Sequence, residues 1–329
     1  MFKTPKFWTE KNLIAYALLP LSYIYFIGFH VKKYFTKTAR ISKPVICVGN
    51  LIAGGSGKTP TAIAIGKILH EMAQEFCYLS RGYMSDGSKF LLLRKFDNNK
   101  AEQVGDEPLL LIETAPTFVS QNRLFGARQI EKMTEFKLVV LDDGMQNESL
   151  HRDFTIVVVV DGKIGFGNGF LIPAGPMRET LGTGLKKADL VVIIGEPQAD
   201  LLKKLEGKTI VKSKVIPTNL DKFFGKKLIA FCGLAYPKKF FSFLRDEGFD
   251  VIETYDFPDH YLYKNQDLES LCHMAEEKNA TLITTRKDWV KFSPAYQQKI
   301  THLDIMLEFE NKELIKEMLG KAIEGFKQK

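Results

Sequence analysis

The chain has 329 residues, with 45% hydrophobic and 26% charged side chains; it is long enough for two domains and too apolar to be disordered. Its net charge of +7 suits a nucleic acid, an anionic membrane surface or a phosphorylated substrate, and no long Lys/Arg block selects among these partners. The cysteines are widely spaced without a C-x-x-C pair, which favours buried thiols in a reducing compartment over a zinc site.

The first predicted element is an uncharged apolar segment, residues 13–29, which reads LIAYALLPLSYIYFIGF. It is at the short limit for a membrane span, and its aromatic residues suit a membrane interface. The Lys-rich flank that follows lacks a cleavage site for a signal peptide and favours a cytoplasmic catalytic body. We expect residues 1–40 to form a membrane anchor helix with a basic flank, either spanning the bilayer or lying in its interface, with a buried core helix as the alternative.

A glycine-rich loop follows the next predicted strand, residues 45–48, and leads into a predicted helix, 59–73. The loop reads Gly54-Gly55-Ser56-Gly57-Lys58-Thr59. Glycines allow backbone N–H groups to approach an anion closely, and a helix N-terminus adds further donors. Lys58 can reach the outer phosphates of a nucleotide, and the Thr59 hydroxyl can bind Mg²⁺. The strict G-x-x-x-x-G-K-[ST] pattern fails at Ile52, but the strand–loop–helix context favours phosphate binding over a flexible linker.

Continuous apolar strands alternate with helices as far as residue 194. The predicted strands are 45–48, 76–79, 90–93, 117–120, 138–141, 155–160 and 190–194, and the predicted helices are 59–73, 107–113 and 124–135. Runs of Val, Ile and Leu in this arrangement predict an α/β domain over residues 41–210, with a mostly parallel sheet of the P-loop NTPase type and helices on both faces. Such sheets bind ligands at the carboxyl ends of their strands.

A second alternating series follows a mixed, Lys-rich segment at 196–226. Its predicted strands are 228–231, 251–255, 281–284 and 305–309, and its predicted helices are 238–247, 267–278 and 312–326. We therefore expect a smaller C-terminal α/β domain over residues 211–329.

Acidic and basic residues stand at the end of one predicted strand and at the end of one long loop. Asp142 and Asp143 end an apolar strand, which is where a Mg²⁺-ordering carboxylate is expected downstream of a phosphate loop. The long loop 165–179 ends in Arg178 and Glu179, which offer a phosphate clamp and a further metal carboxylate.

Two other polar residues have ordinary interpretations when taken alone. Asp106 starts a predicted helix, where a helix N-cap is the simplest role. His260 follows a strand of the second series, where a loop histidine is usually solvated or structural.

Several segments together resemble the tetraacyldisaccharide 4′-kinases, the lipid A kinases of Gram-negative bacteria. They occur in the family's order over nearly the whole chain: residues 48–60, 79–83, 104–108, 142–146, 173–179, 257–261 and 284–288. A residue other than glycine at Ile52 is normal in that family. The chain departs from the family at Asn147, where many members have histidine. No histidine can therefore act on the substrate from that position.

The resemblance implies ATP-dependent, Mg²⁺-assisted phosphorylation of the 4′-hydroxyl of a tetraacylated glucosamine disaccharide 1-phosphate. The reaction would take place at the cytoplasmic face of the bacterial inner membrane. A membrane and this lipid are the expected partners, without a nucleic acid or an obligate protein partner. The resemblance also implies an N-terminal membrane helix and two α/β domains that close about a hinge.

The resemblance further assigns roles to individual residues. Asp106 would be the base on the sugar hydroxyl, and His260 would be oriented against it once the domains close. The loop from Gly55 to Lys58 would hold the β and γ phosphates, and Arg178 would stabilise the transferring charge. The expected metal ligands are Thr59, Asp142, Asp143 and Glu179. The substrate candidates are Arg81, Tyr83, Arg123 and Gln146, and for the first three a structural role is nearly as well supported.

The main alternative is a membrane-associated P-loop switch ATPase. That class usually carries a lysine directly before the Gly-Gly of its loop, where this chain has Ala53. A GTP-dependent switch would need Asn-Lys-x-Asp or Thr-Lys-x-Asp, and in residues 285–288 the lysine is misplaced. A purely structural membrane protein would leave the phosphate loop and its acidic partners unexplained.

Overall fold

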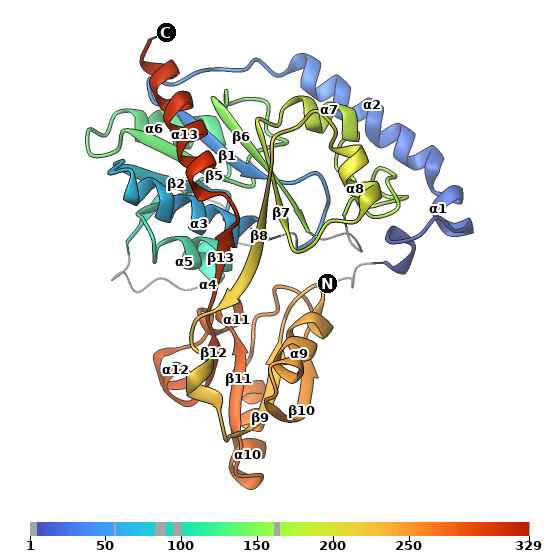
Figure 1. Cartoon of the computed structure of the whole chain (residues 1–329), viewed down its shortest axis with the longest axis vertical. Helices are drawn as coiled ribbons and strands as arrows, with labels where there is room; N and C mark the ends of the chain where they lie inside the picture. Colours follow the sequence, from blue (N-terminus) through green and yellow to red (C-terminus); the bar gives the residue numbers. More distant parts are fainter. Residues whose placement is uncertain (1–4, 56, 83–89, 95–100, 161–164, 329) are drawn as a thin grey trace.

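The apolar strands assemble into two sheets in the computed structural model, which describes residues 5–55, 57–82, 90–94, 101–160 and 165–328 (Figure 1). In the described part of the chain the larger sheet has nine strands in the order β13-β8-β7-β6-β1-β5-β2-β4-β3. All neighbours pair in parallel except the two edge strands, β3 and β13, which are antiparallel to β4 and β8. The strands are β1 Val45–Gly49, β2 Phe76–Ser80, β3 Leu91–Leu93, β4 Thr117–Val119, β5 Leu138–Asp142, β6 Phe154–Val160, β7 Leu190–Ile194, β8 Ile210–Pro217 and β13 Ile305–Phe309.

Helices cover both faces of the larger sheet, because successive side chains of each strand point to opposite sides. In β1, Val45 and Cys47 pack with side chains of α6, α7 and α8, whereas Ile46 and Val48 pack with α3, α5 and α13. These helices are α3 Lys58–Glu71, α5 Asp106–Leu111, α6 Arg123–Glu131, α7 Leu181–Lys186, α8 Ala199–Lys204 and α13 Lys312–Lys327, and the short α4 Ala101–Val104 precedes α5. The predicted α/β architecture with a mostly parallel, doubly covered sheet is confirmed.

The smaller sheet has four parallel strands among the described residues, in the order β10-β9-β11-β12. Helix α9 packs on one face and helices α10 and α12 on the other. The elements are η2 Leu220–Phe223, β9 Lys227–Cys232, α9 Pro237–Asp246, β10 Asp250–Asp256, α10 Asn265–Glu277, β11 Thr281–Thr285, α11 Arg286–Trp289, α12 Pro294–Lys299 and β12 Thr301–Leu303.

The chain passes from the larger sheet to the smaller one and back again, so residues 211–329 are not all in the smaller layer. From residue 211 onward, the rest of β8, all of β13 and α13 belong to the larger sheet and its cover. The two crossings lie side by side, because Thr218 N donates to Asp304 O over 3.0 Å. Periodicity predicted β13 and α13 as elements, but it does not contain the long-range pairing that decides which sheet a strand joins.

The N-terminal apolar segment differs from the continuous helix that its composition suggested. After η1 Lys6–Trp8 it forms two helices, α1 Leu13–Ala17 and α2 Leu19–Phe35, with Pro20 in the first turn of α2. None of the helices in the described ranges is long and apolar enough to cross a membrane. Leu18 separates the two helices, and lysines enter the last turn of α2.

Helix α2 packs on the loop that carries Arg178. The Ser22 hydroxyl donates to Leu171 O over 2.7 Å, and the Tyr25 hydroxyl donates to Arg178 O over 3.0 Å. These bonds connect the N-terminal helices to the larger sheet at the side where its parallel strands end.

Candidate active site

The phosphate loop lies at the carboxyl end of β1, directly before α3. Gly57 is the N-cap of α3 and has φ +73°, a left-handed conformation that favours glycine. Lys58 and Thr59 form the first turn of the helix and are buried. Gly54 and Gly55 precede them, and Ser56 lies outside the described residues. Parallel pairing of Val48 with Asp142 brings the end of β5 next to this loop.

Asp142 and Asp143 occupy different environments, although they are neighbours in sequence. Asp142 is 1% exposed, its Oδ2 lies 3.3 Å from the Thr59 hydroxyl, and burial raises its pKa well above the usual value. Asp143 accepts from Arg178 at 2.9 and 3.0 Å and lies 3.8 Å from the Lys58 ammonium. Burial alone would raise the pKa of Asp143, but these two cations lower it.

The donor set at Asp142 fits a hard divalent cation bound together with a nucleotide. The Asp142 Oδ1 atom is buried without a hydrogen-bond partner, and a hydroxyl lies beside the other carboxylate oxygen. Mg²⁺ usually takes only one or two protein ligands, with waters and phosphate oxygens as the others. No group of three or more His, Cys, Asp or Glu poised for a metal occurs within the described ranges.

Glu179 is paired with two neighbouring side chains. Its side chain is 1% exposed, and one oxygen pairs with the Lys187 ammonium at 2.8 Å. The other oxygen accepts from Gln146 at 3.3 Å, and Gln146 also accepts from Arg178 at 3.2 Å. Gln146 thus holds the Arg178 guanidinium by a hydrogen bond, and Glu179 in turn holds Gln146.

Asp106 and His260 meet across the two sheets. Asp106 begins α5 beside the larger sheet, and His260 lies in the loop after β10 of the smaller sheet, with His260 Nδ1 2.8 Å from Asp106 Oδ2. Asp106 is 5% exposed and makes no side-chain cap hydrogen bond for α5 beyond its contact with the adjacent Glu107 N–H. Burial alone would raise the pKa of Asp106, but the bond from His260 and two neighbouring lysines hold it well below its usual range.

Three further residues lie at this centre, and none of them was predicted as a site residue from the sequence. Burial raises the pKa of Glu107 although the charge of Lys58 acts to lower it, and the Glu107 carboxylate in turn raises the pKa of Asp142. Lys287 and Lys291 lie 3.7 and 3.8 Å from Asp106 Oδ2. Lys287 belongs to a segment that matched the family pattern and could have been chosen on that signal, whereas nothing local marks Lys291.

The candidate substrate-binding residues differ in their exposure and in their contacts. Arg81 is exposed just after β2, and Tyr83 lies outside the described residues. Arg123 is 3% exposed, and its guanidinium donates to Ser120 O and Asp142 O at 3.1 and 3.0 Å. In this structure Arg123 therefore holds the backbone of the acidic strand end rather than facing solvent.

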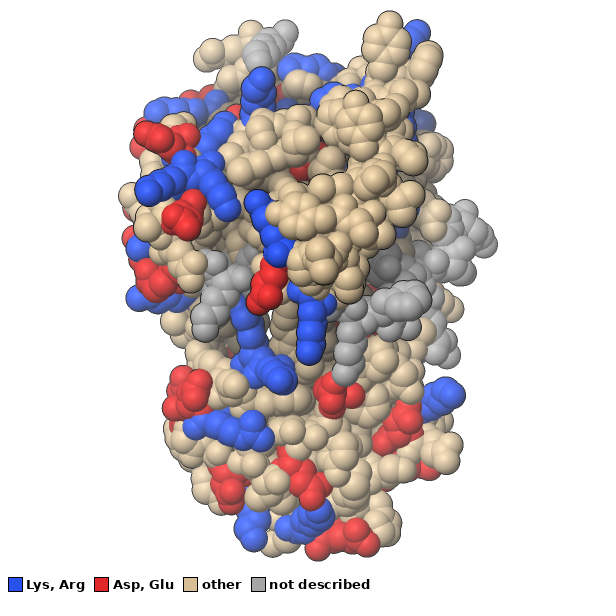
Figure 2. All heavy atoms as spheres, turned by 90° about the vertical axis from the view of Figure 1, so that its right-hand side faces the viewer, with Lys and Arg blue, Asp and Glu red and all other residues tan. Residues whose placement is uncertain are grey.

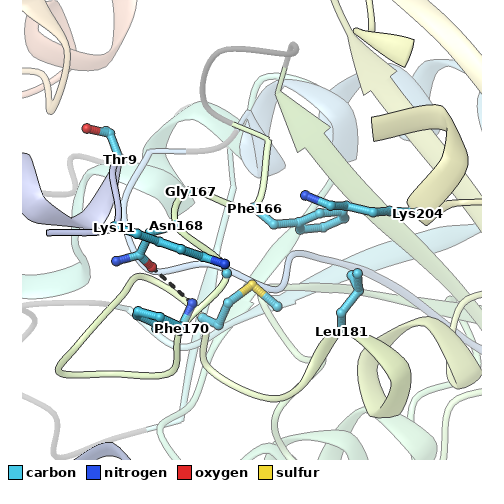
Figure 3. A pocket seen from close by; sticks show the side chains of 10 residues that line it. Thr9, Lys11, Phe166, Gly167, Asn168, Phe170, Leu181 and Lys204 are labelled. Carbon is cyan, nitrogen blue, oxygen red and sulfur yellow. Dashed lines mark hydrogen bonds between the residues drawn. The ribbon is translucent and has the colours of Figure 1, made fainter. Parts of the chain in front are cut away.

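A cavity of about 480 Å³ lies between the N-terminal segment and the loop before Arg178 (Figure 3). Phe166, Phe170 and Leu181 give it apolar walls, and Lys11 and Lys204 extend toward it from opposite sides in Figure 3. Apolar walls with ammonium groups at the edge suit an amphiphile that carries negative charge.

Comparisons with known proteins point to one family. A family model described as Tetraacyldisaccharide-1-P 4'-kinase matches residues 14–324. The chain is 37% identical to the tetraacyldisaccharide 4'-kinase of Rickettsia canadensis, with 98% of each chain covered, and 36% identical to that of Paramagnetospirillum magneticum, with 95% and 96% covered. Its structure resembles a crystal structure of LpxK from Aquifex aeolicus in complex with ATP, with a TM-score of 0.76, 28% identity, and 94% and 100% of the two chains covered.

Proposed function

The chain belongs to the tetraacyldisaccharide 4'-kinase family and is an ATP-dependent kinase of lipid A biosynthesis, and we propose that Asp106 is the base that receives the proton of the substrate hydroxyl. The observation that carries this proposal is the bond of 2.8 Å between Asp106 and His260, which joins the two sheets beside the phosphate loop. A histidine from one layer and a carboxylate from the other form a complete pair only when both layers are in place.

The transfer step follows from this placement. The 4′-hydroxyl oxygen of the disaccharide bonds to the γ-phosphorus, the bond from that phosphorus to the bridging oxygen breaks, and ADP leaves. The hydroxyl proton passes to the Asp106 carboxylate, which is ionised at neutral pH because its pKa is low. Phosphoryl transfer needs positioning and charge stabilisation more than a strong base, so a weak but oriented carboxylate is sufficient.

Cations at the phosphate end supply the charge stabilisation. Lys58 and Arg178 converge on Asp143, which holds both side chains at the mouth of the loop. We place Lys58 on the outer phosphates and Arg178 on the transferring group, where positive charge lowers the barrier most. Arg178 is supported through its carbonyl by Tyr25 and through its guanidinium by Gln146.

Thr59 and Asp142 are the residues that would hold Mg²⁺, and the cation would neutralise phosphate charge when bound. The contacts favour them over Glu179, whose oxygens are taken by Lys187 and Gln146. Asp143 is likewise engaged by Arg178 and Lys58.

We further propose that α1 and α2 lie on the membrane surface, on the cytoplasmic face of the inner membrane. Large apolar side chains of these helices are exposed: Leu13, Ile14, Tyr16, Leu21, Tyr23, Ile24, Ile27, Val31, Tyr34 and Phe35. Figure 2 shows the face on this side, where uncharged side chains form a broad area in the upper half with Lys and Arg side chains beside it. Apolar side chains with neighbouring basic residues are typical of interfacial binding to anionic lipid.

The catalytic role of Asp106 is tested by transfer of labelled phosphate from ATP to a tetraacyl disaccharide 1-phosphate in detergent micelles. Because the carboxylate is the proposed proton acceptor, we expect Asp106→Ala to lower kcat by about 10²–10⁴-fold. ATP binding, measured by calorimetry, should persist. Asp246→Ala changes an exposed aspartate on α9 and should leave transfer unchanged. Full transfer by Asp106→Ala would leave Asp106 a structural role only.

The metal assignment is tested by titrating Mg²⁺ in the same transfer reaction after treatment with a chelator. Asp142→Asn removes the negative charge of the proposed ligand, so we expect its half-saturating Mg²⁺ concentration to rise by roughly tenfold or more. Glu179→Gln should shift this concentration far less. A larger shift in Glu179→Gln than in Asp142→Asn would reverse the assignment.

Membrane docking is tested by flotation with vesicles of phosphatidylethanolamine and phosphatidylglycerol. Ile24→Asp places a charge on the outer face of α2, where Ile24 is 65% exposed, and should reduce the floated fraction. Phe224→Asp makes a similar change at a side chain of the smaller layer that is 63% exposed, and it should float like the wild type. Equal flotation of all three proteins would contradict docking through α2.

A further inference from the structure

Helix α5 of the larger layer packs against α11 of the smaller layer where the two layers meet (Figure 1). Near the start of α5, the ammonium groups of Lys287 and Lys291 lie 3.7 and 3.8 Å from Asp106 Oδ2. Just past the end of α5, the Arg286 guanidinium lies 3.6 Å from the Glu113 carboxylate. The contact between the layers therefore follows the length of α5 and is not confined to one point.

An apolar side chain, Val290, accompanies these charges. It directly follows α11 and keeps helical backbone angles, with φ −65° and ψ −13°. Lys287, Val290 and Lys291 are spaced so that they share one face of this helical turn. Val290 packs on a buried cluster of the larger layer, which we call the α5 cluster: Leu93, Ala101, Val104, Leu109, Ile112 and Val119. Of the apolar side chains that the structure describes in the smaller layer, Val290 is the one found in a core cluster of the larger layer.

The α5 cluster gives the layers a second point of contact, away from Asp106. Leu109 and Ile112 are buried members of this cluster that follow Asp106 along the chain. Because an α-helix rises 1.5 Å per residue, Ile112 lies about 9 Å along the axis from Asp106. A contact at that distance limits rotation of one layer about the bond between Asp106 and His260, which a single hydrogen bond leaves free.

The polar contacts do not supply this second point equally well. Those of Asp106 all lie at one end of α5. At the other end, the side chains of Arg286 and Glu113 are 28% and 40% exposed, and an ion pair in contact with water contributes little. Packing of Val290 removes apolar surface from water and depends on a close fit, so it favours one angle between the helices.

We propose that Val290 is a positioning residue for the kinase reaction. By packing on the α5 cluster it fixes the angle between α5 and the smaller layer, and with it the geometry of Asp106 and His260. This inference rests on the proposed role of Asp106. Since Val290 acts through packing against α5, its loss should affect the transfer step and leave the phosphate loop as it is.

The test is transfer kinetics on the full chain in detergent micelles. Val290→Ala removes the branched methyl groups, and we expect kcat to fall about tenfold, with the KM for ATP within about twofold, because a misplaced base loses rate steeply. Val290→Ile keeps an apolar, β-branched side chain and should recover most of kcat. Val251→Ala is the matched control, because Val251 is a partly buried valine of β10 that packs in the core of the smaller layer. It should leave kcat unchanged.

Repeating the substitution in Asp106→Asn separates positioning from a general loss of structure. If Val290 acts through Asp106, Val290→Ala should lower kcat in that background by about twofold or less. An equal fall in both backgrounds would overturn the inference, because Val290 would then act independently of Asp106. Unchanged kcat in Val290→Ala would overturn it too.

A milder variant covers the case in which Val290→Ala does not fold. Val290→Thr keeps the shape of valine but adds a hydroxyl to the α5 cluster, so we expect kcat to fall about threefold. The comparison with Asp106→Asn then decides by the same rule. Full transfer by Asp106→Ala would instead defeat the proposed base, and that result is obtained with Val290 intact, so the two failures are distinguishable.

Discussion

The bond between Asp106 and His260 is the interaction on which the proposed site depends. It spans 2.8 Å and joins α5 beside the larger sheet to a loop of the smaller sheet. Each layer alone holds half of the pair: the larger one has the phosphate loop and the carboxylate, and the smaller one has the imidazole. An arrangement of this kind limits transfer to water, because an incomplete site lacks the oriented base.

Charge distribution explains why buried carboxylates can coexist at this sheet edge. Burial raises the pKa of Asp142 although the charges of Lys58 and Arg123 act to lower it, whereas Asp143 and Asp106 each form ion pairs with two cations and have lowered pKa values. An isolated buried carboxylate is costly unless a cation compensates it. Asp142 is thus the acid at this edge with the most to gain from a bound cation.

The sequence predicted most of the strands, the phosphate loop and the acidic strand end, because each depends on local composition or spacing. It could not show that β13 and α13 return to the larger sheet, since strand pairing is a long-range property. The buried contacts of Arg123 and the position of Lys291 were hidden for the same reason. Asp106 and His260 are 154 positions apart, so only family resemblance could suggest pairing them.

The measurement that tests the central claim most directly is a double-mutant cycle in kcat/KM on Asp106→Asn, His260→Gln and the double variant. If the two side chains act as one unit, the loss in the double variant will be about equal to the larger of the two single losses. Single losses that multiply in the double variant would show that Asp106 and His260 act independently, and that result would contradict a site assembled through their bond.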